Sequence, residues 1–191
     1  ERIPKAIFTG LVKIGSLSAI ENFVMVTSTK QNYVYLVDTT VPKIVAKQYV
    51  AMQYTKGAAL SSNNFVSLNP FGGPSRQLDL KTGQSRDIPT TCASDVIAAS
   101  PEKGLVAAVC HGLGATDLNI RVGKIETFDN PIWQFNTTGS PFGISFGRDH
   151  TEVYVVVVLT EGTFLYHIFA SGRQFEKLPF QWGHQFVFVE K

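Results

Sequence analysis

The amino-acid sequence predicts an all-β protein, and three observations indicate this class. The 191 residues include 14 Phe and 6 Tyr together with long valine runs, and these residue types favour strands. No segment keeps the 3.6-residue period of an amphipathic helix. Short apolar runs also recur at a spacing of about 40 residues, which is typical of repeat architectures.

The first two repeat units have the same order of strands and turns. In the first unit, apolar stretches separated by turns are expected to form strands at 22–28, 33–38 and 44–50. The second unit repeats this order with strands at 64–68 and 76–80 and a turn at 81–83. Asp38 and Asp79 therefore end equivalent strands.

The third and fourth units complete the repeat. In the third unit, the turn Ser100–Gly104 joins two inner strands, and all four strands are expected at 95–99, 105–109, 118–125 and 131–135. In the fourth unit, strands are expected at 141–146, 153–158, 164–169 and 174–179. Each unit is thus a four-stranded meander, and the four meanders are expected near 14–50, 56–90, 93–135 and 140–180.

Two features of the units indicate a β-propeller of four-stranded antiparallel blades, in one domain over 1–191. The innermost strands are rich in Ala, Ser and Gly, as needed where blades converge on a channel. The second strands are nearly continuous apolar runs, as expected between adjacent blades. We expect about four blades plus an extra strand at 185–189, with 5–8 as a further outer strand. Together they would form part of a larger propeller, and a closed four-bladed ring is the alternative.

The repeat resembles that of YVTN-type (YncE-like) propellers, a lactonase-like family of WD40-type architecture. The resemblance rests on Phe23-Val24-Met25-Val26-Thr27, Val34-Tyr35-Leu36-Val37-Asp38 and Lys43-Ile44-Val45-Ala46. Pro141-Phe142-Gly143-Ile144-Ser145-Phe146 similarly resembles the inner hairpin of lactonase-like propellers. These motifs specify strands and turns rather than an activity. The third unit departs from the pattern, with Gly123 in place of the strand-ending aspartate, which leaves its register open.

Charge and hydropathy exclude two classes of partner. The net charge is +2 and the basic residues are scattered, so we expect no nucleic-acid partner. The longest apolar run, Val153–Leu159, is strand-sized, so we expect no membrane span. The chain opens Glu1-Arg2 without a signal-peptide pattern, which fits a mature chain, an excised domain or a fragment.

The sequence contains no complete catalytic constellation, so we predict a non-catalytic binding or scaffold propeller with unknown catalytic residues. The alternative is a lactonase-like hydrolase or redox propeller with a metal or cofactor in the channel. Partners are expected on the loop-rich face or the channel mouth, and they include a protein, a carbohydrate, further blades or a chain that closes the propeller. The candidate binding residues are Lys30, Phe71, Asp95, His111, Asp117 and Glu161.

Several of these residues have a second interpretation. The resemblance implies a divalent metal near Asp95, but only this residue offers a ligand there, so we expect no metal site and no cofactor. His111 follows Cys110, and a Cys–His nucleophile is an alternative to a surface histidine. We expect Phe71 to pack on its own blade, with an anchor for a protein or sugar as the alternative.

Cys92 and Cys110 flank the hairpin of the third unit. If Ala99 lies opposite Leu105, the cysteines are diagonal neighbours about 7–8 Å apart between Cα atoms. A bulge at Gly104 or fraying at the strand end would bring them within disulfide range, and two buried thiols are the alternative. A disulfide, together with the glycosylation pattern at Asn136, would favour a secreted protein over a cytoplasmic one.

Overall fold

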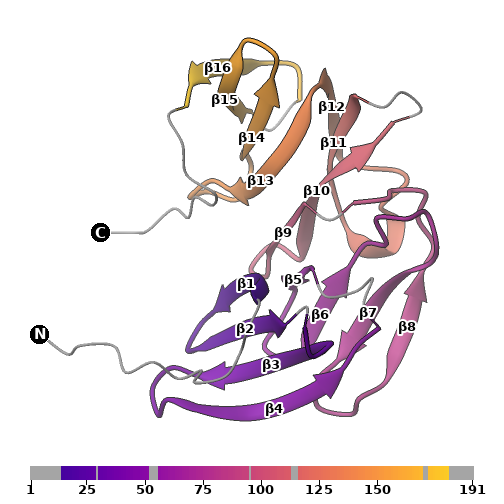
Figure 1. Cartoon of the computed structure of the whole chain (residues 1–191), viewed down its shortest axis with the longest axis vertical. Helices are drawn as coiled ribbons and strands as arrows, with labels where there is room; N and C mark the ends of the chain where they lie inside the picture. The colour runs from indigo at the N-terminus through magenta and orange to yellow at the C-terminus, as the bar shows by residue number, and fades with distance from the viewer. Residues whose placement is uncertain are drawn as a thin grey trace, which may run out of the picture.

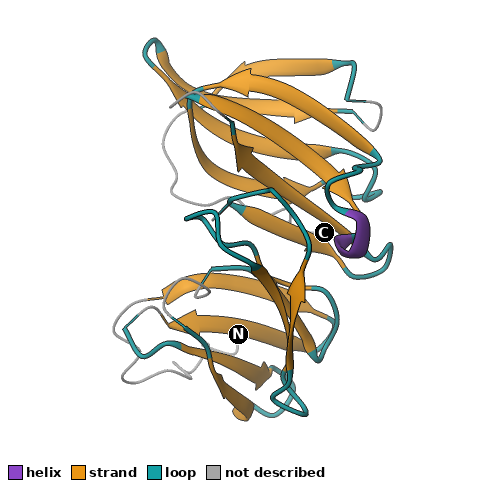
Figure 2. Cartoon of the chain, turned by 90° about the vertical axis from the view of Figure 1, so that its right-hand side faces the viewer, coloured by secondary structure: helices purple, strands orange, loops and turns teal. Residues whose placement is uncertain are grey.

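The structure is a computed structural model that describes residues 14–28, 30–51, 56–94, 96–112, 116–169 and 172–180. Within these residues the chain forms sixteen strands in four antiparallel four-stranded sheets. The described residues include one helical element, a 3-10 turn at Ile125–Thr127, which is drawn in purple in Figure 2. The predicted all-β class is therefore confirmed.

Each sheet follows chain order from its first strand to its fourth. The first two sheets consist of β1 (Ile14–Ile20), β2 (Phe23–Ser28), β3 (Tyr33–Asp38) and β4 (Lys43–Tyr49), then β5 (Ala58–Ala59), β6 (Asn64–Ser67), β7 (Ser75–Asp79) and β8 (Ser85–Ile88). The other two consist of β9 (Ile97–Ser100), β10 (Leu105–His111), β11 (Asp117–Gly123) and β12 (Trp133–Thr138), then β13 (Ser140–Phe146), β14 (Val153–Leu159), β15 (Gly162–Ile168) and β16 (Phe175–Pro179).

The four sheets are the blades of a β-propeller, with their first strands nearest the common centre (Figure 1). These inner strands contact one another in chain order, β1 with β5, β5 with β9 and β9 with β13. We refer to the sheets as blades 1 to 4. Each blade lies where the repeat pattern predicts it, and blade 3 extends to Thr138 rather than ending near 135.

Three hydrophobic clusters hold the blades together. Met25 and Leu36 of blade 1 pack with Phe65 of blade 2. The cluster between blades 2 and 3 and the cluster between blades 3 and 4 are built in the same way, and every residue of β10 from Val106 to Cys110 is buried. The second strands therefore lie between adjacent blades, as predicted from their continuous apolar runs.

Small residues in the inner strands are required by close packing. Ala58 and Ala59 of β5 are buried. At the preceding Gly57, a Cβ atom would lie 2.2 Å from the carbonyl oxygen of Val66, which no side chain tolerates. This observation supports the predicted reason for Ala, Ser and Gly in the inner strands.

Blade 3 differs from the others at its outer turn. In blades 1 and 2, Asp38 and Asp79 accept hydrogen bonds from backbone N–H groups of the next few residues and so close tight turns. In blade 3, β11 ends at Gly123, and a longer connection with the 3-10 turn precedes β12. The predicted outer strands at 118–125 and 131–135 are therefore displaced to Asp117–Gly123 and Trp133–Thr138.

Two predicted strands, at 5–8 and 185–189, lie outside the described residues. Among the described residues there is no helix with the length and hydrophobicity needed to cross a membrane.

Candidate functional site

One end of the propeller carries most of the predicted binding residues. The four blades are wound identically, so the loops between their second and third strands lie on the same face. We call the described residues of these loops, at 30–32, 68–74, 112, 116 and 160–161, together with the adjoining strand ends His111 and Asp117, the Phe71 face. The turns at 39–42, 80–84 and 124–132 join third and fourth strands and lie on the opposite face. Lys30, Phe71, His111, Asp117 and Glu161 thus come from four different blades on one face.

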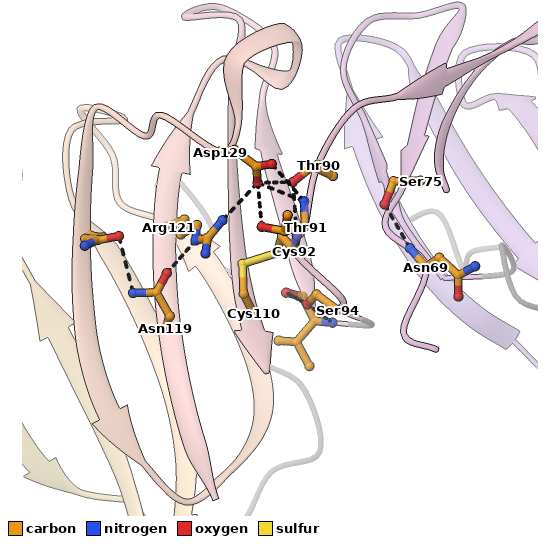
Figure 3. Close-up of a disulfide and its surroundings, with 12 residues drawn as sticks. Asn69, Ser75, Thr90, Thr91, Cys92, Ser94, Cys110, Asn119, Arg121 and Asp129 are labelled. Carbon is orange, nitrogen blue, oxygen red and sulfur yellow. Dashed lines mark hydrogen bonds and ion pairs between the residues drawn. A yellow bond between two sulfur atoms is a disulfide. The ribbon is translucent and has the colours of Figure 1, made fainter. Parts of the chain in front are cut away.

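Phe71 is the most exposed large hydrophobic residue among those described, with 85% of its surface accessible. The prediction that its ring packs on its own blade is wrong. Asn69 takes the inward position instead: it is 6% exposed, and its Oδ1 accepts a hydrogen bond from the Phe71 N–H at 2.9 Å. Its own N–H donates to the buried Ser75 hydroxyl at 3.1 Å, as Figure 3 shows. The hydrogen bonds of the buried Asn69 and Ser75 therefore fix the loop backbone, while the Phe71 ring faces solvent.

Charged residues accompany the aromatic ring on this face. Lys30 is exposed. Glu161 is also exposed and pairs with Lys177 Nζ at 3.1 Å. Its own backbone N–H, followed by Lys177 and the Thr160 hydroxyl, lowers the pKa of the Glu161 carboxyl. Glu161 is therefore ionised at neutral pH, and the face carries both signs of charge.

His111 and Asp117 are exposed at facing ends of β10 and β11. The Gly112 N–H donates to the Asp117 carbonyl oxygen at 2.8 Å, which closes the base of their loop. Cys110 is bonded to Cys92, so the Cys–His nucleophile considered from the sequence does not exist in this structure. Asp95 lies outside the described residues. The part of the chain that the structure describes holds no group of three or more His, Cys, Asp or Glu side chains placed to bind a metal.

The predicted disulfide is present, but the predicted register is wrong by one residue. The Cα atoms of Cys92 and Cys110 are 5.0 Å apart. Leu105 pairs with Ser100 rather than with Ala99. The Val109 N–H bonds to the Val96 carbonyl, whereas the His111 N–H bonds to the Ala93 carbonyl, so the register shifts between these two bonds. This shift at the strand end brings the cysteines within disulfide range.

Asp129 was not identified from the sequence. It links the segment that leads into blade 3 to the outer turn of the same blade. Its carboxylate accepts hydrogen bonds from the Thr90 hydroxyl at 2.8 Å, the Thr91 N–H at 2.9 Å and Arg121 at 3.1 Å (Figure 3). Thr90 and Thr91 lie just before Cys92, and they are 39 and 38 positions away from Asp129 in the sequence. The sequence feature that could have indicated this contact is the connection between Gly123 and Trp133, which is longer than the corresponding turns of blades 1 and 2.

We expect Asp129→Asn to lower the free energy of unfolding by about 1–2 kcal/mol at neutral pH. Solvent screening limits the effect, since the side chain is 38% exposed. Burial alone raises the pKa of Asp129, but the bonds from Thr91, Thr90 and Arg121 outweigh it and hold the pKa below the usual 3.8.

The sign of the pH dependence follows from this lowered pKa. The contribution of Asp129 to stability is complete above the unfolded-state pKa near 4 and is lost as the pH falls through the lower folded-state pKa. The difference between wild type and Asp129→Asn in urea unfolding should therefore shrink below about pH 4. If the difference in unfolding free energy between wild type and Asp129→Asn instead grows as the pH falls, the stabilising role of the ionised Asp129 carboxylate is contradicted.

Comparison with known proteins supports the fold. Neither a protein-family profile nor a curated protein sequence matches the chain. Among solved structures, it is similar to Kuenenia stuttgartiensis hydrazine synthase (TM-score 0.64, 13% identity, 94% of this chain and 53% of that one). It is also similar to the β-propeller domain of Myceliophteria thermophila Swd1, with a TM-score of 0.60 and 13% identity over 81% of this chain and 52% of that one. A chain of a nidogen–laminin complex gives a TM-score of 0.68 and 11% identity over 87% of this chain and 64% of that one.

These similarities establish the architecture and nothing more specific. Identities of 11–13% show the fold alone. The chain spans about half the length of the first two structures. The prediction of a propeller repeat is therefore confirmed at the level of fold.

Proposed function

We propose that the chain is a non-catalytic binding propeller that recognises a protein partner through the Phe71 face. The observation that carries this proposal is the 85% exposure of Phe71 above a loop fixed by the buried side chains of Asn69 and Ser75. An aromatic side chain has few rotatable bonds, and its supporting loop is already ordered. Binding would therefore lose little conformational entropy.

The composition of the face fits protein recognition. Interface hot spots are typically aromatic residues surrounded by a polar rim that excludes water. Phe71 supplies the aromatic centre, and Lys30, His111, Asp117 and Glu161 supply exposed polar groups on the neighbouring loops. One of the similar solved structures, the nidogen–laminin complex, is itself a protein–protein assembly.

Three finer assignments belong to the same proposal. The YVTN-type family membership rests on the repeat motifs quoted from the sequence. A secreted location is supported by the Cys92–Cys110 disulfide. Glycosylation at Asn136 is supported by its exposed position on the outer strand β12, where its Oδ1 accepts a bond from Asn119 at 2.5 Å. A glycan on Nδ2 would leave that acceptor in place.

A random peptide library displayed on phage and selected against the immobilised chain tests the proposal. We expect the enriched peptides to bind wild type at least tenfold more tightly than Phe71→Ala, which corresponds to about 1.4 kcal/mol. Ile132→Ala is the matched control, because Ile132 is 65% exposed but lies on the opposite face. Peptides whose affinity falls with Ile132→Ala and not with Phe71→Ala would refute the proposal.

The loop beneath the ring provides a second variant. Asn69→Ala keeps Phe71 but removes the bond to its backbone N–H. We expect a smaller loss of peptide affinity than for Phe71→Ala, seen mainly as a lower association rate, because the ring must be ordered on binding. Equal binding by wild type and Asn69→Ala, measured by biolayer interferometry, would show that preorganisation of this loop is irrelevant.

A further inference from the structure

Blades 1 and 2 form a pocket between them with a volume of about 190 Å³. The described residues that line it come from the end of β4 in blade 1 and from β6, β7 and β8 of blade 2. An apolar cavity of about 150 Å³ is large enough to bind benzene. The pocket therefore has room for a single aromatic ring. Phe71 is not one of these lining residues, so the site is distinct from the Phe71 face.

One side of the pocket is apolar and already ordered. Phe65 pairs with Leu78 across β6 and β7, and these two side chains are 2% and 6% exposed. Val50, which follows β4, belongs to the same hydrophobic cluster and lines the pocket from blade 1. Because this cluster joins the two blades, the apolar wall of the pocket needs no rearrangement to receive a ligand.

Blade 1 packs closely against the outer turn of blade 2 at one end of the pocket. Gly83 lines the pocket in this turn and has a φ of +74°. A Cβ atom at Gly83 would lie 3.0 Å from Oε1 of Gln48, a residue of β4, so the glycine allows this approach. Ser85 also lines the pocket and is exposed. Its hydroxyl can donate or accept a hydrogen bond from a ligand.

The other side of the pocket carries an oriented guanidinium group. Arg76 lines the pocket, and its Nε lies 3.2 Å from Oδ1 of Asp87 on the neighbouring strand β8. This ion pair orients the guanidinium plane beside the apolar wall, and such a plane can stack on an aromatic ring. Because Asp87 balances the charge of Arg76, a neutral ring fits the pocket better than a carboxylate does.

We propose that this pocket binds a small neutral aromatic molecule, consisting of one ring with a single hydrogen-bonding substituent. The ring packs on Phe65 and Leu78 with the Arg76 guanidinium against its face. The substituent forms a hydrogen bond with the Ser85 hydroxyl. This site is independent of the proposed recognition of a protein at the Phe71 face.

Phenol is the probe for this site, and cyclohexanol is its matched control. Cyclohexanol has the same hydroxyl group and a similar size but no aromatic face. In titrations of the isotope-labelled chain, we expect phenol to perturb the backbone amides of the lining residues, such as Phe65 and Leu78. Phenol should bind about two- to fivefold more tightly than cyclohexanol, as expected for a cation–π contact at an exposed site. Benzoate, which adds a negative charge, should bind more weakly than phenol.

Ser85→Trp tests the location of the site by filling the pocket. Ser85 lies opposite Leu78 on the edge strand β8, so an indole at this position occupies the space of the ligand. We expect this variant to lose phenol binding. Ile132→Trp carries the same side chain at an exposed position outside the pocket and should bind phenol like wild type.

Arg76→Met tests the stacking without filling the pocket. Methionine keeps an aliphatic side chain but lacks the guanidinium, and Asp87 stays hydrated because its side chain is 65% exposed. We expect phenol to lose its advantage over cyclohexanol in this variant. A preference for phenol that persists in Arg76→Met would contradict the stacking arrangement.

Three further results would overturn the proposal. One is phenol binding to Ser85→Trp at wild-type strength, with circular dichroism showing the variant to be folded, because the ring would then bind elsewhere. Another is equal affinity of wild type for phenol and cyclohexanol, which would remove the requirement for an aromatic ring. The third is tighter binding of benzoate than of phenol, which would make the pocket an anion site.

Discussion

Phe128→Ala is expected to lower the free energy of unfolding by about 3–5 kcal/mol, as for other fully buried phenylalanines. Phe128 has no accessible surface and belongs to the hydrophobic cluster between blades 2 and 3. It reaches this position from the connection between β11 and β12, so its removal leaves a cavity at the junction of two blades. Urea unfolding followed by tryptophan fluorescence measures the change.

Phe71→Ala is the matched control for this prediction. It deletes the same atoms from a residue that is 85% exposed, so we expect a change below about 0.5 kcal/mol. Similar losses for the two variants would mean that Phe71 is packed in solution. A loss below 1 kcal/mol for Phe128→Ala would mean that the connection is not docked between the blades.

Removal of the disulfide is expected to cost about 3 kcal/mol. The Cys92–Cys110 bridge spans 18 positions, and its loss restores conformational entropy to the unfolded chain. Cys92→Ala combined with Cys110→Ala tests this without a reductant, and alanine avoids burying unsatisfied hydroxyls. The melting temperature should fall by about 6–12 °C for a domain of this size.

Two measurements check the disulfide prediction. Thiol titration of the denatured, unreduced wild type should find no free thiol, and two free thiols would contradict the bridge and the argument for secretion. The double variant also loses two buried side chains of the cluster that contains Phe128. Its effect should therefore not add to that of Phe128→Ala, because neighbouring sites share one packing environment.

Local patterns were sufficient to predict the blades. The second strands, such as β10 and β14, are buried over most of their length, and their continuous apolar runs indicate this burial directly. The repeat spacing then places each sheet. Blade 3 was predicted least well, because Gly123 replaces the turn aspartate and the next residues form a 3-10 turn with no periodic signal.

Details that depend on contacts distant in sequence were not predictable. Asp129 bonds to Thr90 and Thr91, and no local pattern pairs these positions. The exposure of Phe71 depends on which loop residue turns inward. Asn69 takes that position, where its backbone N–H donates to the Ser75 hydroxyl and its side-chain oxygen accepts from the Phe71 N–H. The cysteine register depended on one irregularity at the end of a strand. In each case the deciding interaction was a specific hydrogen bond rather than hydrophobicity.

The binding surface can be mapped directly by titrating the isotope-labelled chain with an enriched peptide and following backbone amide chemical shifts. We expect the perturbed amides to cluster in the loops of the Phe71 face, at 68–74 and at the neighbouring positions 30–32, 111–112 and 160–161. The turns of the opposite face, at 39–42, 80–84 and 124–132, should be unaffected. Perturbations concentrated in those turns, with the Phe71 loop unchanged, would contradict the proposed binding function.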